Sequence, residues 1–171
     1  MQVLRWLQRH LLATPAGHFS MKKLYDSLRS QGIPVGKDTL YAYLDYLTDA
    51  FLIRTISMHS RSERQRMANP RKAYPIDPGL IPLYERAGRE QRGRALETTV
   101  LLELERRGYS VEWVRTASGW EVDFLAQQPG TKSQLLQVSL DTSADETWER
   151  EVRALAEGAV SHPEAEATQV E

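Results

Sequence analysis

The segment from 119 to 139, GWEVDFLAQQPGTKSQLLQVS, constrains the fold most, because it has the pattern of two strands joined by a turn. Apolar and polar residues alternate through its first half, as expected for a strand with two different faces. The apolar face of this strand is predicted to contain Trp120, Val122, Phe124 and Ala126. Glu121 and Asp123 would then share the other face. The segment therefore predicts a β-hairpin with one apolar face and one acidic face.

Matching the apolar faces of the two strands fixes their register, because a slip of one residue would turn every side chain over. Phe124 should lie opposite Leu136, with a three-residue turn at 129–131. The same register pairs Val122 with Val138, Trp120 with Leu140, Asp123 with Gln137, and Glu121 with Ser139. The polar face of the hairpin is thus predicted to carry acid, amide and hydroxyl groups.

A third acid, Glu97, lies on the apolar stripe of a predicted long helix that ends before Gly108. A carboxylate on the buried side of a helix costs free energy unless it is paired or binds a cation. If Glu97 faces the hairpin, it joins Asp123 and Gln137 in an oxygen-rich site suited to Mg²⁺ or Mn²⁺. A metal there could activate water against a phosphodiester. The alternative is that the strand acids are ordinary solvent-facing charges on a half-exposed sheet.

The first half of the chain shows helical periodicity at 2–13, 20–31 and 37–50, followed by two short strands around 50–58 and 72–77. Three helices followed by a two-stranded ribbon predict a winged helix, a fold that binds DNA in many proteins. The region around the ribbon is basic, and clustered positive charge is sufficient for phosphate contact. The predicted nucleic-acid-binding residues are Arg61, Arg64, Arg66, Arg71 and Lys72. The alternatives are a protein–protein adaptor and a solvated, mobile loop.

Composition excludes several classes of protein. The chain has 171 residues, a formal net charge of −1 and no cysteine. Disulfides, thiolate chemistry and cysteine-based zinc sites are therefore ruled out. No apolar run approaches the roughly 20 residues that a membrane-spanning helix needs. We therefore expect a cytoplasmic protein without a membrane partner.

Seven stretches in order along the chain carry a resemblance to a known family. They are HFSMKKLYDSL, DTLYAYLDYLTDAFLI, KAYPIDPGL, GRALETTVLLELERRG, GWEVDFL, LLQVSLD and WEREVRAL. Together they resemble the C-terminal region of bacterial and archaeal AAA-type ATPases, in which a winged helix precedes a domain of unknown function with a PD-(D/E)XK nuclease-like core. The resemblance implies an α+β fold. Residues 1–80 would form the winged helix-turn-helix, residues 81–158 the α-β-β-β-α nuclease-like core, and residues 159–171 a disordered tail.

The resemblance also assigns roles to residues of the site. Glu97 matches the helix acid of the nuclease motif, and Asp123 matches its metal-binding aspartate. Gln137 stands where a second acid is usual, and Ser139 stands where a lysine is usual. The lost lysine points to weak or absent cleavage, with Arg115 as the nearest substitute cation. The favoured expectation is a non-catalytic accessory module that binds DNA or a partner ATPase domain; the alternative is an active magnesium-dependent endonuclease.

The ATPase itself is not expected in this sequence. GIPVGKD at 32–38 has three residues between its glycines and no Ser or Thr after the lysine, so it departs from the phosphate-binding loop. The segment after the last predicted helix also shows no strand pattern. We therefore expect a truncated member of the family that does not hydrolyse ATP.

Overall fold

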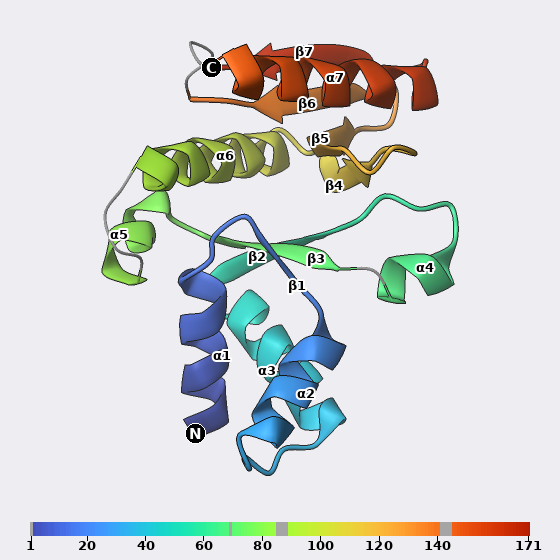
Figure 1. The fold of residues 1–171 in the computed structure, drawn as a ribbon. Coiled ribbons are helices and arrows are strands. Elements are labelled where there is room, and N and C mark those ends of the chain that lie inside the picture. Colours follow the sequence, from blue (N-terminus) through green and yellow to red (C-terminus); the bar gives the residue numbers. More distant parts are fainter. Residues whose placement is uncertain (1, 69, 85–88, 141–144) are drawn as a thin grey trace.

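The computed structural model describes residues 2–68, 70–84, 89–140 and 145–171. It is a layered α+β structure, which confirms the predicted fold class. Figure 1 shows helices at the N-terminal end, a small sheet across the middle, and a larger sheet with its helices at the other end. No helix in the described part of the chain is both long and apolar enough to cross a membrane.

The N-terminal end is a bundle of three helices, α1 (Gln2–Leu12), α2 (Met21–Ser30) and α3 (Lys37–Asp49). Ser20 caps α2, since its hydroxyl accepts a hydrogen bond from the Lys23 amide. Apolar side chains at helical spacing bury the facing stripes of the three helices. The fully buried ones are Leu7, Leu11, Leu12, Leu28, Leu40 and Leu44. This end therefore has an apolar core of its own.

The small sheet has three antiparallel strands in the order β1-β3-β2. They are β1 (Gly17–Phe19), β2 (Ile53–Ser57) and β3 (Arg71–Pro75). The predicted two-stranded ribbon gains β1 because the chain between α1 and α2 runs along the free edge of β3, pairing His18 with Lys72. The basic stretch after β2 contains a short helix, α4 (Glu63–Ala68), and β3 is followed by the short helices η1 (Pro78–Leu80) and α5 (Ile81–Tyr84).

The large sheet has the strand order β4-β5-β6-β7. Its strands are β4 (Ser110–Arg115), β5 (Glu121–Gln127), β6 (Gln134–Val138) and β7 (Glu166–Val170). The first three are antiparallel, whereas β7 runs parallel to β6 along its other edge. The prediction of a disordered tail at 159–171 without a further strand is therefore wrong. The weak apolar pattern of β7 hid it, because β7 is an edge strand with three exposed residues at its start.

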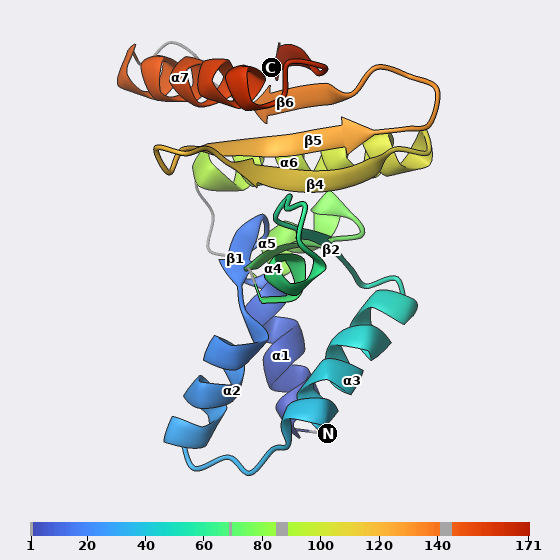
Figure 2. The same ribbon diagram turned by 90° about the vertical axis from the view of Figure 1, so that its right-hand side faces the viewer.

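The helices α6 (Arg89–Arg106) and α7 (Asp145–Ser161) cover opposite faces of the large sheet, as the rotated view shows (Figure 2). Leu101 and Leu104 of α6 pack with Phe124 and Leu136 on one face. Ala154 of α7 packs with Val122, Leu125 and Leu135 on the other. The first cluster also contains Ile56 and Tyr74 of the small sheet, so the two sheets share one core.

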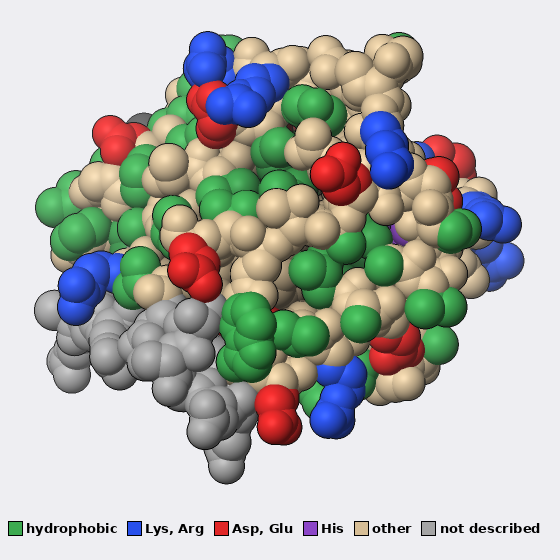
Figure 3. All heavy atoms as spheres, turned by 90° about the horizontal axis from the view of Figure 1, so that it is seen from above, with side chains coloured by type: hydrophobic (Ala, Val, Ile, Leu, Met, Phe, Trp, Pro, Cys, Tyr) green, Lys and Arg blue, Asp and Glu red, His purple; other side chains and the backbone are tan. Residues whose placement is uncertain are grey.

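The helix α7 is turned differently from the orientation that its apolar pattern predicts. Trp148, Val152 and Leu155 lie at helical spacing and would form its apolar face, but Trp148 and Val152 are 42% and 39% exposed. Figure 3 views the molecule from the α7 end and shows hydrophobic side chains among charged ones on this surface. The face against the sheet carries small residues instead, and a Cβ added at Gly158 would come within 2.9 Å of the Val122 side chain. Small residues let α7 lie close to the sheet.

The hairpin has the predicted register where its strands pair. Phe124 lies opposite Leu136, Leu125 opposite Leu135, and Ala126 opposite Gln134. The connection is longer than the predicted three-residue turn, because β5 ends at Gln127 and β6 begins at Gln134. Gly130 takes a positive φ of 79° within this connection, a conformation that glycine adopts without strain.

Candidate functional site

A buried lysine lies at the junction of the small sheet, α6 and the large sheet. Lys72 of β3 has a side chain that is 3% exposed, and its Nζ atom contacts three carboxylates. Nζ lies 3.1 Å from Glu97 Oε1, 2.6 Å from Glu121 Oε1 and 3.2 Å from Asp123 Oδ1. We call these four residues the Lys72 cluster. An ammonium group surrounded by carboxylates satisfies the requirement that buried charges be paired.

Strand alternation places Lys72 in this cluster. Residues two apart on a strand point to the same face, so Lys72 points the same way as the fully buried Tyr74. The Tyr74 hydroxyl donates a hydrogen bond of 2.8 Å to Glu97 Oε1, the same oxygen that Lys72 contacts. Lys72 was predicted among the exposed nucleic-acid-binding residues, and its burial corrects that prediction.

A β-bulge in β5 places the two strand acids. Glu112 pairs with Leu125 and Val114 pairs with Val122, so two residues of β5 oppose one residue of β4. Such a bulge breaks the alternation of side chains along the strand. The predicted apolar face is therefore wrong: Val122 packs on the α7 side, whereas Phe124 packs on the α6 side. The acids lie on the side of the small sheet, where they reach Lys72.

Asp123 also connects the cluster to β6. Its Oδ2 accepts a hydrogen bond of 3.0 Å from the Val138 amide, and its own amide donates one of 3.4 Å to Gln137 Oε1. The structure thus brings together Glu97, Asp123 and Gln137, the three residues predicted to form the site. Ser139, the fourth predicted residue, is also buried and comes directly after β6. The cation beside Asp123 is Lys72, which comes from β3.

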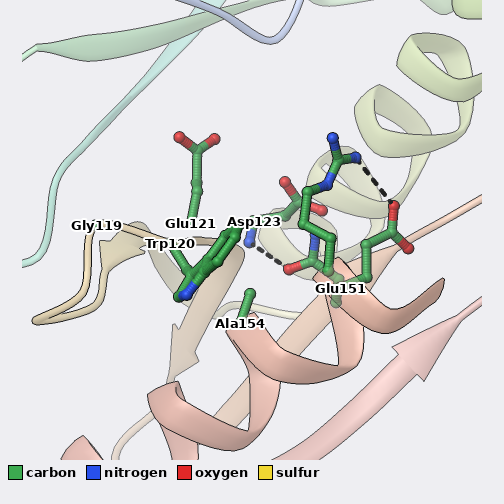
Figure 4. Close-up of a pocket in the computed structure, with 8 residues that line it drawn as sticks. Gly119, Trp120, Glu121, Asp123, Glu151 and Ala154 are labelled. Carbon is green, nitrogen blue, oxygen red and sulfur yellow. Dashed lines mark hydrogen bonds and ion pairs between the residues drawn. The ribbon is translucent and has the colours of Figure 1, made fainter. Parts of the chain in front are cut away.

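A cavity of about 330 Å³ opens beside Asp123, between the start of β5 and α7. We call it the Asp123 cavity. Its polar lining consists of Glu121, Asp123, Gln137, Arg150 and Glu151, and Trp120 forms an aromatic wall. Figure 4 shows the residues that line this cavity, with Glu151 and Ala154 projecting from α7. The guanidinium of Arg150 lies 3.7 Å from Glu151 Oε1.

Burial and neighbouring charges change the pKa values of the acids in this region. Burial and the charge of Asp123 raise the pKa of Glu97 to about 7, although Lys72 and Tyr74 act in the opposite direction. Burial also raises the pKa of Glu151, which Ser139 and Arg150 partly offset. Burial alone would lower the pKa of Lys72, yet its three carboxylates raise that pKa far above the usual range. Lys72 therefore stays protonated, and the acids around it outnumber it.

His18 of β1 extends the Lys72 cluster toward the surface. Its Nε2 atom lies 3.1 Å from Glu121 Oε2, and its ring packs on Trp113 with centroids 4.6 Å apart. Burial would raise the pKa of Glu121, but hydrogen bonds with His18 and Lys72 and their charges lower it to about 2. Glu121 is therefore ionised across the physiological range.

The site residues that sequence reasoning missed had only weak signals. The signal for Lys72 is its position two residues before Tyr74, which places both on the same face of β3. The signal for Glu151 is that it shares a side of α7 with Ala154 and Gly158. These small residues mark the face of the helix that lies close to the large sheet. No local signal pointed to His18, because β1 is three residues long.

The residues predicted to bind phosphate differ in their exposure and in their contacts. Arg61 and Arg64 are exposed, and Arg71 is half-buried. Arg66 contacts Glu63 at 3.0 Å and Glu112 at 3.4 Å, which neutralises part of its charge. Arg115, considered as a substitute for the missing lysine, is exposed with its guanidinium 5.6 Å from the centroid of Trp113.

The Asp123 cavity carries oxygen atoms of the kind that hard divalent cations prefer. Within the described ranges no group of three or more His, Asp or Glu side chains is gathered tightly enough to hold a metal as it stands. Asp123, Gln137 and Glu151 nevertheless bring two carboxylates and an amide oxygen to one cavity, which is the chemistry that Mg²⁺ prefers. Glu151 Oε2 is buried and has no hydrogen-bond partner among the residues that the structure describes. Such an oxygen is free to act as a ligand.

Comparison with known proteins finds relatives of much greater length. The chain is 30% identical over 155 residues to the uncharacterized protein MJ1544 of Methanocaldococcus jannaschii, a match that covers 88% of this chain and 33% of the relative. It is 32% identical over 107 residues to an uncharacterized protein of Haemophilus influenzae, covering 62% of this chain and 26% of that protein. The chain therefore spans a third or less of these relatives. No protein-family model and no solved structure matches.

Proposed function

We propose that this chain carries a metal-dependent phosphodiesterase centre that acts on nucleic acid and is built around Asp123. The observation that carries the proposal is the position of Lys72, whose ammonium lies 3.2 Å from Asp123 Oδ1. A lysine beside an aspartate that would bind the metal would supply the positive charge that Ser139, directly after β6, lacks. The active nuclease is therefore better supported by the geometry than by the sequence pattern alone.

The chain's own residues would divide the work. Asp123, Gln137 and Glu151 would hold Mg²⁺ or Mn²⁺ in the Asp123 cavity, and Glu97 would support Asp123 through their shared contact with Lys72. When bound, the metal would polarise the phosphodiester and activate water. Lys72 holds the Asp123 carboxylate in place through their contact of 3.2 Å. Arg150 at the cavity wall would contact the substrate phosphate, where its guanidinium can form two parallel hydrogen bonds.

Cleavage assays with matched variants test this proposal. The purified chain should cut single-stranded, double-stranded or branched DNA when Mg²⁺ or Mn²⁺ is added, and EDTA should stop it. Asp123→Asn keeps the shape of the side chain but removes its charge, so it should lower the rate by about 100-fold or more. Asp45→Asn changes an exposed acid on α3 and should leave the rate unchanged. Thermal melts of both variants control for folding.

One observation favours a second candidate, the non-catalytic accessory module. Lys72 is saturated by three carboxylates and is only 3% exposed, so its ammonium cannot touch a substrate without leaving them. In that case the centre would be a structural remnant, and the chain would bind DNA or a partner ATPase domain. Salt-sensitive DNA binding with no cleavage under either metal would support this candidate and contradict the nuclease.

A further inference from the structure

The wall of the Asp123 cavity contains a tryptophan whose position is unusually well fixed. The turn before Trp120 is closed by two hydrogen bonds, from the Thr116 amide to the Trp120 carbonyl at 2.8 Å and from the Trp120 amide to the Thr116 hydroxyl at 3.0 Å. The Ser118 amide donates to Glu157 Oε1 of α7 at 2.8 Å, which ties the turn to the helix. Gly119 permits this turn with a φ of 89°.

The indole is also held from the side of α7. The guanidinium of Arg153 lies 5.7 Å from the centroid of the Trp120 ring, within range of a cation–π contact. Figure 4 shows Trp120 next to Ala154, whereas Glu121 points to the opposite side. A side chain fixed by both a turn and a helix is preorganised, so a ligand that stacks on it loses little entropy in ordering the protein. Trp120 is therefore held in a position from which it can stack on a ligand.

The size of the cavity restricts what can reach Asp123. A volume of about 330 Å³ lies at the lower end of the range for sites that enclose small molecules. Asp123 lines the cavity and is only 8% exposed. A base-paired duplex presents its phosphates on the outside of a wide, rigid cylinder. Enzymes with enclosed sites of this kind act on unpaired nucleotides or extrude one from the duplex.

The charges of the cavity match the parts of a nucleotide. The acids Asp123 and Glu151 repel a phosphate unless a divalent cation lies between them, whereas Arg150 at the wall attracts it. Trp120 offers a flat aromatic surface to a base, and stacking of this kind accepts any base. We infer that the Asp123 cavity takes one unpaired nucleotide, with the base against Trp120 and the phosphate at Arg150, so that single-stranded nucleic acid is the substrate class. This inference rests on the proposed function for the position of the scissile phosphate.

Binding measurements with a non-cleaving metal test the inference directly. A fluorescently labelled single-stranded oligonucleotide and a blunt duplex of the same sequence are titrated in Ca²⁺, and fluorescence anisotropy gives the Kd of each. The wild type should bind the single strand at least 10-fold more tightly than the duplex. Trp120→Leu keeps an apolar side chain against Val122 and Ala154 but removes the aromatic face. It should weaken single-strand binding by about 10-fold or more. Trp120→Phe should retain most of the affinity.

A second tryptophan provides the matched control. Trp148 belongs to α7, the helix that borders the cavity. Its side chain is exposed on the outer face of that helix and does not line the cavity. Trp148→Leu should leave single-strand binding unchanged. Equal affinity of the wild type for single strand and duplex would overturn the inference. So would unchanged single-strand binding by a folded Trp120→Leu variant.

The same proteins separate this inference from the proposed function. A wild type that cuts duplex as fast as single strand retains the proposed activity but contradicts the unpaired-nucleotide cavity. If the wild type binds the single strand through Trp120 but cuts nothing, the inference about the cavity holds and the proposed nuclease activity is wrong. Cleavage of single strands that is lost in Asp123→Asn and slowed in Trp120→Leu supports both.

Discussion

The two ends of the molecule bury different kinds of side chain. The helical end buries leucines against one another, with Leu7 and Leu28 fully enclosed. The sheet end buries Asp123, Gln137, Glu151 and, from the small sheet, Lys72. Apolar burial is non-directional and tolerates small changes, whereas a buried charge depends on each partner being present. The comparison predicts that the same size of substitution will have different consequences at the two ends.

Removing the cation of the Lys72 cluster should have the largest effect. Lys72→Met keeps much of the side chain's bulk but leaves Glu97, Glu121 and Asp123 without their shared partner. Breaking a buried ion pair in this way typically costs about 3–5 kcal/mol of stability. Chemical denaturation at neutral pH measures the loss.

A second variant shows whether charge, and not packing, causes that loss. The double variant Lys72→Met with Asp123→Asn removes one of the orphaned charges, so it should recover part of the lost stability. Lys22→Ala is the surface control, because Lys22 pairs with Asp26 in full contact with solvent and should show no measurable change. A loss in Lys72→Met that the double variant does not reduce would contradict the electrostatic explanation.

The helical end should respond by the apolar mechanism. Leu28→Ala in α2 removes buried methyl groups and leaves a cavity, which should cost about 3 kcal/mol. This loss should be independent of salt and nearly independent of pH between 5 and 8, because no charged group is involved. Denaturation curves at two salt concentrations and two pH values measure it. A strong pH dependence would indicate that the two ends unfold as one electrostatically coupled unit.

The same contrast explains how far the sequence could predict the molecule. The helices of the first half follow from leucines at helical spacing, and the register of the hairpin follows from Phe124 and Leu136, because apolar periodicity is a local signal. The Lys72 cluster depends on contacts between residues as far apart as 72 and 123, which periodicity cannot report. Glu97, Asp123 and Gln137 were predictable as a group from their resemblance to a motif, but their cation was not.

Two other errors have local structural causes. The bulge in β5 reverses the alternation between Val122 and Phe124, and no turn residue or glycine announces it. The orientation of α7 was predicted from its largest apolar residues, Trp148 and Val152, yet the small residues face the sheet. Both errors arise where a polar site needs an irregular backbone or a close approach, so they concentrate around the Asp123 cavity.

The smallest predicted effect is a pH dependence that only the sheet end should show. The folded state raises the pKa of Glu97 from 4.5 to about 7, so it holds a proton that the unfolded chain has released. Stability that this proton confers is complete below about pH 4.5 and is lost as pH rises through 7. Glu97→Gln keeps a neutral group at every pH. In EDTA it should therefore resemble the wild type at pH 5 and exceed its stability by ~2 kcal/mol at pH 8.

Comparing the two proteins at each pH cancels the titration of histidines, which both share. Glu103→Gln is the matched control, because Glu103 is on the same helix but its hydrogen bonds with Arg106 and Arg107 lower its pKa to about 2. A group with a lowered pKa contributes stability above its unfolded value, so its difference from the wild type should stay flat between pH 5 and 8. If Glu97→Gln also stays flat, Glu97 is ionised throughout this pH range, and the folded state does not hold the proton that its raised pKa implies.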